Sequence, residues 1–173
     1  MRRWNGWGDE GFNLAMPEQG QDFLASRIGS GRPLADATLD SVCAKVPETR
    51  LTRPADLESL IDTGPEARVR HARGQSLADW LAMRSGEFGV FPDGVAYPTT
   101  SEEVQTLLSW AAEQHIHLIP YGGGTSVAGH INPVDKGQPV LTVDMSRMNR
   151  LIDLDTESQI ATFGAGTPGP LVE

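Results

Sequence analysis

Ten consecutive residues, reading Pro-Tyr-Gly-Gly-Gly-Thr-Ser-Val-Ala-Gly from 120 to 129, have a composition suited to binding an anion. Glycine adopts backbone conformations that are closed to other residues, and it lets backbone amides approach a ligand closely. Successive amides in such a turn form a concave anion-binding nest, to which the hydroxyl groups of Thr125 and Ser126 would add two donors. The loop therefore favours a phosphate or pyrophosphate ligand, although a glycine-rich surface turn without a ligand has the same composition.

Two common nucleotide-binding motifs do not fit this loop. No lysine follows the glycines, so the loop is not the GxxxxGKS/T turn of nucleotide hydrolases, and its spacing is not GxGxxG. Residues 87–173 hold 3 basic and 11 acidic side chains, whereas residues 1–86 hold 11 and 12. We therefore expect main-chain amides and hydroxyl groups, without cationic side chains, to hold the phosphates. That arrangement fits a dinucleotide pyrophosphate better than a nucleoside triphosphate.

The composition narrows the class of protein. A formal net charge of −9 over 173 residues argues against a nucleic-acid-binding protein, which needs a basic patch. No apolar run is long enough to span a bilayer, and no hydrophobic segment follows Arg2 and Arg3 as it would in a secretory signal. We expect a cytoplasmic protein with one or two domains and a real core.

A basic segment in the first half is the second candidate for chemistry. It could form an anion site for a phosphorylated substrate, or a solvated face that is salt-bridged to Glu66 and Asp79, and we favour the salt-bridged face. Its members are Arg68, Arg70, His71 and Arg73.

Five further side chains are expected to do no chemistry. Cys43 has no partner for an internal disulfide and is expected to be an inert thiol. His115 and His117 have no third ligand nearby in the sequence, so we expect no metal site. Trp4 and Trp7 are expected to anchor the N-terminal arm on another part of a longer protein.

Regular elements are expected on both sides of the glycine loop. Residues 94–98 predict a strand, Thr100 and Glu103 a capping box, and Val104, Leu107, Leu108 and Ala111 the apolar face of the helix that follows. With the strand at 118–119, these elements predict a parallel strand–helix–strand unit with a right-handed crossover. Further expected elements are a strand at 140–143, a hairpin of 151–154 with 160–163, and the start of a helix at 170, where the chain looks truncated.

The first 87 residues give weaker signals. We expect a helix that opens at Pro54, runs through Leu57, Leu60 and Ile61, and stops at Gly64. A second helix, capped by Ser76, should run from Leu77 and end at Gly86. Residues 13–50 receive no assignment. The expected domains are a mostly helical or irregular region at 1–87 and an α/β unit at 88–173, which together make an α+β fold.

Several motifs resemble a known family of flavoproteins. The series Pro92-Asp93-Gly94-Val95, Ser101-Glu102-Glu103-Val104 and Gly122-Gly123-Gly124-Thr125-Ser126 is similar to the FAD-binding domain of the vanillyl-alcohol oxidase and p-cresol methylhydroxylase (PCMH) superfamily. Within it, Trp4-Asn5-Gly6-Trp7-Gly8, Arg70-His71-Ala72-Arg73-Gly74 and Asp144-Met145-Ser146-Arg147-Met148-Asn149-Arg150 resemble the alkylglycerone-phosphate synthase family. The resemblance covers nearly the whole chain, apart from about residues 13–50.

The resemblance implies a cofactor and its binding residues. FAD would be wrapped at its pyrophosphate by Pro120, Tyr121, Gly122, Gly123, Gly124, Thr125 and Ser126. Some members of the superfamily attach FAD to a histidine in this loop. Gly124 stands at that place here, so FAD should be non-covalent, and attachment at the nearby His130 is not expected. The second glycine turn, Gly164–Gly169, resembles a segment near the cofactor, and a purely structural turn is the alternative.

The resemblance also implies a reaction. Enzymes of the synthase family exchange the acyl chain of acyl-dihydroxyacetone phosphate for a fatty alcohol, in ether-lipid synthesis. The catalytic residues of that family would lie beyond residue 173, and so would any peripheral membrane contact. A homodimer is expected for the longer protein. Two alternatives stay open, namely an FAD-linked oxidoreductase of 2-hydroxy acids such as lactate or glycolate, and a fragment that is inactive by itself.

Overall fold

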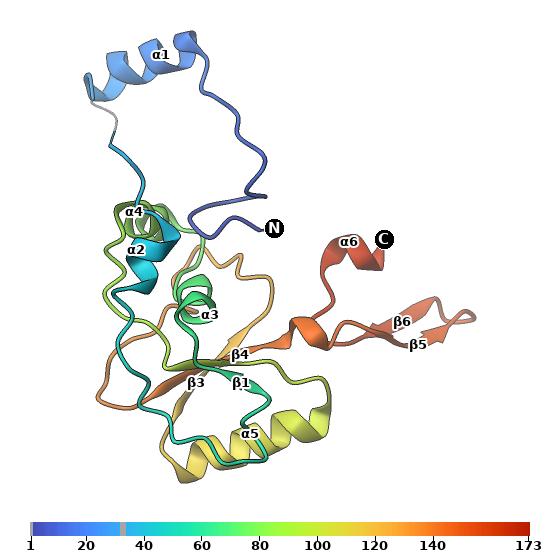
Figure 1. Ribbon diagram of the computed structural model, residues 1–173. Coiled ribbons are helices and arrows are strands. Elements are labelled where there is room, and N and C mark those ends of the chain that lie inside the picture. Colours follow the sequence, from blue (N-terminus) through green and yellow to red (C-terminus); the bar gives the residue numbers. More distant parts are fainter. Residues whose placement is uncertain (1, 32–33) are drawn as a thin grey trace.

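The computed structural model describes residues 2–31 and 34–173 and shows an α+β fold (Figure 1). A small mixed sheet lies at its centre, α5 covers one side of it, and α2, α3 and α4 gather near one end (Figure 1). In chain order the elements are α1 (Glu18–Ile28), α2 (Leu39–Cys43), β1 (Ile61–Asp62), α3 (Pro65–Arg70), α4 (Leu77–Ser85), β2 (Gly94–Ala96), α5 (Ser101–Glu113), β3 (His117–Tyr121), β4 (Val140–Asp144), a 3₁₀ turn at Met145–Arg147, β5 (Leu151–Asp155), β6 (Ile160–Phe163) and α6 (Gly169–Val172).

The central sheet has the strand order β1-β2-β4-β3. Strands β2 and β3 both run parallel to β4, which lies between them, and β1 is antiparallel to β2. The expected parallel unit is therefore present, but β4 is inserted between its two strands. All five residues of β4 are buried, as expected for a strand with neighbours on both sides.

Helix α5 forms where its local signals predict it. The hydroxyl of Thr100 accepts a hydrogen bond from the amide of Glu103 at 3.2 Å. The carboxylate of Glu103 turns back to the amide of Thr99 at 2.6 Å, one residue before the expected partner. Leu107 packs in a core cluster with Ile61, Ala96 and Leu141. Leu108 was expected on the packed face but is exposed, because the buried stripe runs through Leu107 and Ala111.

A second core cluster joins the helices of the first half. Val42 of α2, Val69 of α3 and Met83 of α4 pack together with Phe88 and Phe91. Trp4 stacks on Phe88 with ring centroids 6.3 Å apart, so this tryptophan anchors the N-terminal arm within the described chain and not on another part of a protein.

Asp93 joins the first half to the sheet just before β2. Its carboxylate accepts hydrogen bonds from the amide and guanidinium of Arg50 at 2.8–3.0 Å and from the amide of Val140 at 2.7 Å. Burial favours the neutral acid, but these donors outweigh it and lower the pKa of Asp93. Strand β1 also pairs with β2, so residues on both sides of the expected boundary at 87/88 build one sheet.

The expected helix from Pro54 to Gly64 was wrong. Residues 55–60 form turns, and Ile61 pairs with Ala96 in the sheet. Gly64 is the N-cap of α3 and not the end of a helix, because the side chain of Asp62 accepts the amide of Gly64 at 2.7 Å and Pro65 then opens the helix. Apolar residues at helical spacing are here buried by a short strand and its preceding turn.

The remaining elements are the helix after Ser76, the hairpin near residue 155 and two helices near the N-terminus. The helix capped by Ser76 is confirmed, with a reciprocal bond to Asp79 and Gly86 in the left-handed conformation at its end. The hairpin β5–β6 is confirmed, and it projects from the body of the molecule (Figure 1). Two helices lie in the unassigned stretch, α1, which has no buried residue, and α2, which Thr38 caps.

Candidate cofactor-binding site

The glycine loop begins where strand β3 ends. Tyr121, the last residue of β3, is the register partner of Asp144, the last residue of β4. The carboxyl ends of these parallel strands therefore meet at one edge of the sheet, which is where ligands bind in open α/β sheets.

The loop presents free amides at this edge. Within the described part of the chain, the backbone amides of Gly122 to Ser126 donate no hydrogen bond. Gly122 and Gly123 are exposed, and an added Cβ would meet no atom within 4 Å at Gly122 and only the Thr125 methyl, at 3.5 Å, at Gly123. Backbone amides need partners when they are shielded from water. These amides can therefore donate to a ligand.

Gly124 has a different role in the loop. Its φ of +64° lies in the left-handed region, and an added Cβ would collide with the hydroxyl of Tyr121. The Arg2 guanidinium would lie 3.0 Å from the same Cβ. Glycine is therefore required here so that Tyr121 and Arg2 can lie against the loop.

The other residues of the expected set lie on either side of the three glycines. Pro120 is exposed within β3, and Tyr121 is buried. Thr125 is exposed and Ser126 is half-buried, and the cavity is lined by neither. The hydroxyl of Ser126 lies 3.3 Å from Nδ1 of His130. Tyr121, Gly122 and Gly123 are thus the members of the set that face the cavity.

The segment that follows α3 holds the back of the loop. The amide of Gln75 donates to the carbonyl of Ser126 at 2.6 Å, and the amide of Gly74 donates to Oδ1 of Asn132 at 3.0 Å. Asn132 in turn donates to Asp79 at 2.6 Å. A Cβ on Gly74 would collide with the Ser126 carbonyl, so this close approach requires glycine.

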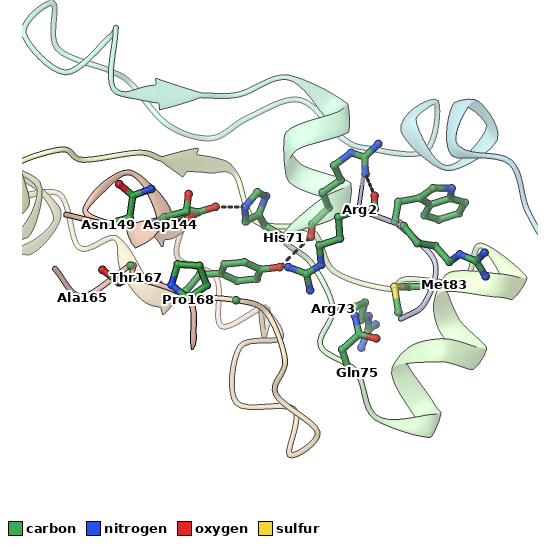
Figure 2. A pocket seen from close by; sticks show the side chains of 18 residues that line it. Arg2, His71, Arg73, Gln75, Met83, Asp144, Asn149, Ala165, Thr167 and Pro168 are labelled. Atoms are coloured by element: carbon green, nitrogen blue, oxygen red, sulfur yellow. Dashed lines mark hydrogen bonds and ion pairs between the residues drawn. The ribbon is translucent and has the colours of Figure 1, made fainter. Parts of the chain in front are cut away.

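A cavity of about 470 Å³ opens beside the loop (Figure 2). This volume is within the range of small-molecule sites. In Figure 2 the second glycine turn lies at one end, with Ala165, Thr167 and Pro168, and Arg73, Gln75 and Met83 lie at the other. The lining residues are Arg2, Arg3, Trp4, Arg70, His71, Arg73, Gln75, Met83, Tyr121, Gly122, Gly123, Asp144, Ser146, Asn149, Ala165, Gly166, Thr167 and Pro168.

Cationic side chains line the cavity beside the loop, although the half of the chain that contains the loop has few of them. Four arginines and a histidine from the first half line the same cavity as Gly122 and Gly123. Charge counted along the sequence did not reveal this, because the fold carries the N-terminal arm and the end of α3 across to the loop. The four arginines are Arg2, Arg3, Arg70 and Arg73.

The basic segment also departs from a solvated face. Arg70 pairs with Glu66 at 2.9 Å, as expected, and Arg73 lies 3.8 Å from Asp79. Arg68, however, is buried and donates to the carbonyls of Pro92 and Pro47 at 2.6 and 2.7 Å. Arg68 therefore has a structural role and does not belong to the cavity.

His71 and Asp144 form a buried pair at the cavity wall. His71 Nε2 lies 2.8 Å from Oδ2 of Asp144, and Nδ1 lies 2.7 Å from the carbonyl of Ala67. These two contacts fix the orientation of the imidazole ring between α3 and the end of β4. Burial opposes ionisation of Asp144, but its hydrogen bonds with His71 and Ser146 lower its pKa.

Two tyrosines flank His71. The Tyr121 ring lies 4.6 Å from the His71 ring and the Tyr97 ring 5.8 Å from it, centroid to centroid. Burial and the nearby Asp144 carboxylate raise the pKa of Tyr97 to about 12. Burial likewise raises the pKa of Tyr121, although its hydroxyl is hydrogen-bonded to the Arg2 side chain. Both phenols therefore stay neutral at physiological pH.

The second glycine turn is closely packed and also lines the cavity. Gly164 and Gly166 allow close backbone approach, because an added Cβ would collide with the carbonyls of Met148 and Met145 respectively. Ala165, Gly166 and Thr167 also line the cavity. The glycines of the turn are thus required by packing, and the turn stays a candidate for contact with the cofactor.

Among residues 2–31 and 34–173, no group of three or more His, Cys, Asp or Glu side chains is arranged to hold a metal ion. In the same residues, no helix is long and apolar enough to cross a membrane.

The donors at this edge of the sheet fit a dinucleotide. Unpaired loop amides, glycines without side chains and a cationic cavity are suited to a pyrophosphate. Residues 92–173 match the family model described as an FAD binding domain, and this part of the chain belongs to that family. Residues 92–173 are thus part of an FAD-binding domain, and FAD is the cofactor that this domain binds.

Two relatives and one solved structure are similar to the chain. The chain is 27% identical over 200 residues to alkyldihydroxyacetonephosphate synthase of Trypanosoma brucei brucei. This match covers 99% of this chain and 33% of that protein. It is 35% identical over 78 residues to the mitochondrial D-lactate dehydrogenase (cytochrome) 1 of Saccharomyces cerevisiae, covering 44% of this chain and 13% of that protein. A solved structure of alkyldihydroxyacetonephosphate synthase superposes with a TM-score of 0.79 at 24% identity, over 99% of this chain and 36% of that one.

Proposed function

We propose that this chain holds FAD by its pyrophosphate through Gly122, Gly123, Gly124, Thr125 and Ser126, together with Pro120 and Tyr121 at the end of β3. The observation that carries the proposal is the row of unpaired amides from Gly122 to Ser126 beside the cavity. Bound FAD supplies the reactive flavin ring, and the residues described here position the cofactor.

Non-covalent binding follows from the same loop. At Gly124, where some members of the superfamily carry the histidine that attaches FAD, a side chain would collide with Tyr121. The exposed His130 interacts with the hydroxyl of Ser126 and does not line the cavity. The protein therefore offers no nucleophile at the place where attachment occurs.

For the whole enzyme we propose the synthase reaction, in which a fatty alcohol replaces the acyl chain of acyl-dihydroxyacetone phosphate. The synthase match extends over 99% of the chain, including the first half, whereas the D-lactate dehydrogenase match covers 44%. The chain spans about a third of the length of the synthase, and the substrates are therefore proposed for the whole enzyme. The natural gene product should form alkyl-dihydroxyacetone phosphate from those substrates. Reduction of a dye by D-lactate instead would support the 2-hydroxy-acid oxidoreductase.

Cofactor binding can be tested with the chain itself. FAD is added to the purified protein and its bound fraction is measured by equilibrium dialysis. Gly123→Asp places a negative charge toward the phosphates at a position with open space, so the fold should persist while FAD affinity falls more than tenfold. Gly31→Asp adds the same charge where no atom lies within 4 Å, and its FAD affinity should match that of the parent protein. Equal affinity in all three proteins would remove the loop from the site.

A further inference from the structure

Four arginines line the cavity, and three of them have hydrogen-bond partners within the protein. Arg3 donates to the carbonyl of Phe12 at 2.9 Å and to Oδ1 of Asn13 at 2.6 Å. Arg2 is hydrogen-bonded to Tyr121. Arg70 donates to Glu66, Glu10 and the carbonyl of residue 2. These three arginines are held by the protein.

Arg73 differs from the other three. It makes no hydrogen bond within residues 2–31 and 34–173, and its Nε is buried without a partner. Its closest carboxylate, that of Asp79, lies 3.8 Å from Nη1, which is too far for a hydrogen bond. Only 23% of the Arg73 side chain is exposed, so water reaches little of it.

Asp79 already accepts three hydrogen bonds from groups other than Arg73. Its Oδ1 already accepts from Asn132 at 2.6 Å, and its Oδ2 accepts from the amide and hydroxyl of Ser76 at 3.1 and 2.6 Å. These bonds cap α4 and hold the support of the glycine loop. A buried donor without a partner is rare in folded proteins and calls for an explanation such as an absent ligand.

The backbone places Arg73 next to the glycine loop. Gly74 approaches the Ser126 carbonyl so closely that a side chain would collide with it, and the amide of Gln75 donates to that same carbonyl at 2.6 Å. Arg73 immediately precedes these two residues and lines the same cavity as Gly122 and Gly123. Loop amides and guanidinium are therefore parts of one fixed unit.

We propose that Arg73 is a ligand-binding residue that pairs with the pyrophosphate held by the glycine loop. This inference rests on the proposed function and deepens it, since it assigns the counter-charge that residues 87–173 do not provide. The planar guanidinium can bind two phosphate oxygens at once. The first half of the chain then contributes directly to cofactor affinity.

Inorganic pyrophosphate is the probe for this site, because it lacks the flavin and the adenosine. Its affinity for the 173-residue protein is measured by calorimetry in low salt. Arg73→Met, similar in length and uncharged, should weaken binding at least tenfold, and Arg73→Lys should lie between the two, because it keeps the charge but not the fork. Arg27→Met, on the exposed helix α1, is the matched control and should bind as the parent does. Equal affinity for Arg73→Met and the parent protein would overturn the proposal.

FAD titrated onto the same proteins separates the two claims. Loss of FAD affinity in Arg73→Met, with normal circular dichroism, supports both. If the parent binds pyrophosphate through Arg73 but does not bind FAD, the anion site stands and the dinucleotide assignment fails. If FAD binds the parent and Arg73→Met equally, the role of Arg73 is overturned and the FAD site remains. Should Arg73→Met not fold, the comparison of Arg73→Lys with the parent decides.

Discussion

Substituting Gly124 by alanine tests how the glycine loop is built. The left-handed backbone at this position costs an alanine roughly 1–2 kcal/mol. The new Cβ would also collide with the hydroxyl of Tyr121, whose side chain is buried against His71 and hydrogen-bonded to Arg2. Forcing a packed side chain aside costs about 1–3 kcal/mol. We therefore expect Gly124→Ala to lose about 2–5 kcal/mol of unfolding free energy.

Two neighbouring glycines separate these contributions. Gly129 also has a positive φ, +75°, but its added Cβ would meet no atom closer than Nδ2 of Asn132 at 3.6 Å, so Gly129→Ala should lose only the backbone part. Gly123 has neither problem, and Gly123→Ala should change stability by less than about 0.5 kcal/mol. Urea unfolding followed by circular dichroism measures all three. If Gly124→Ala were as stable as Gly129→Ala, Tyr121 would not occupy the space behind the loop.

Two further predictions concern the scaffold. Thr100→Ala should lose about 1 kcal/mol of unfolding free energy relative to Thr106→Ala on the same helix, because it removes the N-cap bond of α5, and unchanged thermal stability would contradict this. Asp93→Asn should lose about 2 kcal/mol at pH 7, less than a fully buried pair would, because Arg50 is 40% exposed. Since the pKa of Asp93 is lowered by folding, its contribution is complete above about pH 4 and is lost as the pH falls through the folded-state pKa. The stability difference between the parent and Asp93→Asn should therefore shrink in acid, and a difference independent of pH would contradict the lowered pKa.

Local chemistry explains what the sequence alone predicts correctly. The caps at Ser76 and Thr100, the strand at β4 and the β5–β6 turn each depend on residues a few positions apart. The expected helix at Pro54 failed because Ile61 finds a strand partner 35 positions along the chain, at Ala96, which no local pattern reveals.

The candidate site likewise has parts that the local sequence predicts and parts that only the fold brings together. Glycine composition indicated the loop and its ligand class, because backbone conformation is a local property. The sequence did not reveal that arginines line the cavity beside the loop, since Arg2 and Arg73 reach it only through the fold. The expected domain boundary, the homodimer and the cytoplasmic location stay predictions.

The central claim is that the amides of the glycine loop contact FAD. An ¹⁵N-labelled sample of this 18.7 kDa protein, titrated with FAD and followed by amide NMR spectra, tests it residue by residue. We expect the largest shifts at Gly122–Ser126, smaller ones at Ala165–Thr167, and none at the exposed hairpin turn Thr156–Ser158. Saturating FAD that leaves the amides of Gly122–Ser126 unshifted would contradict the account.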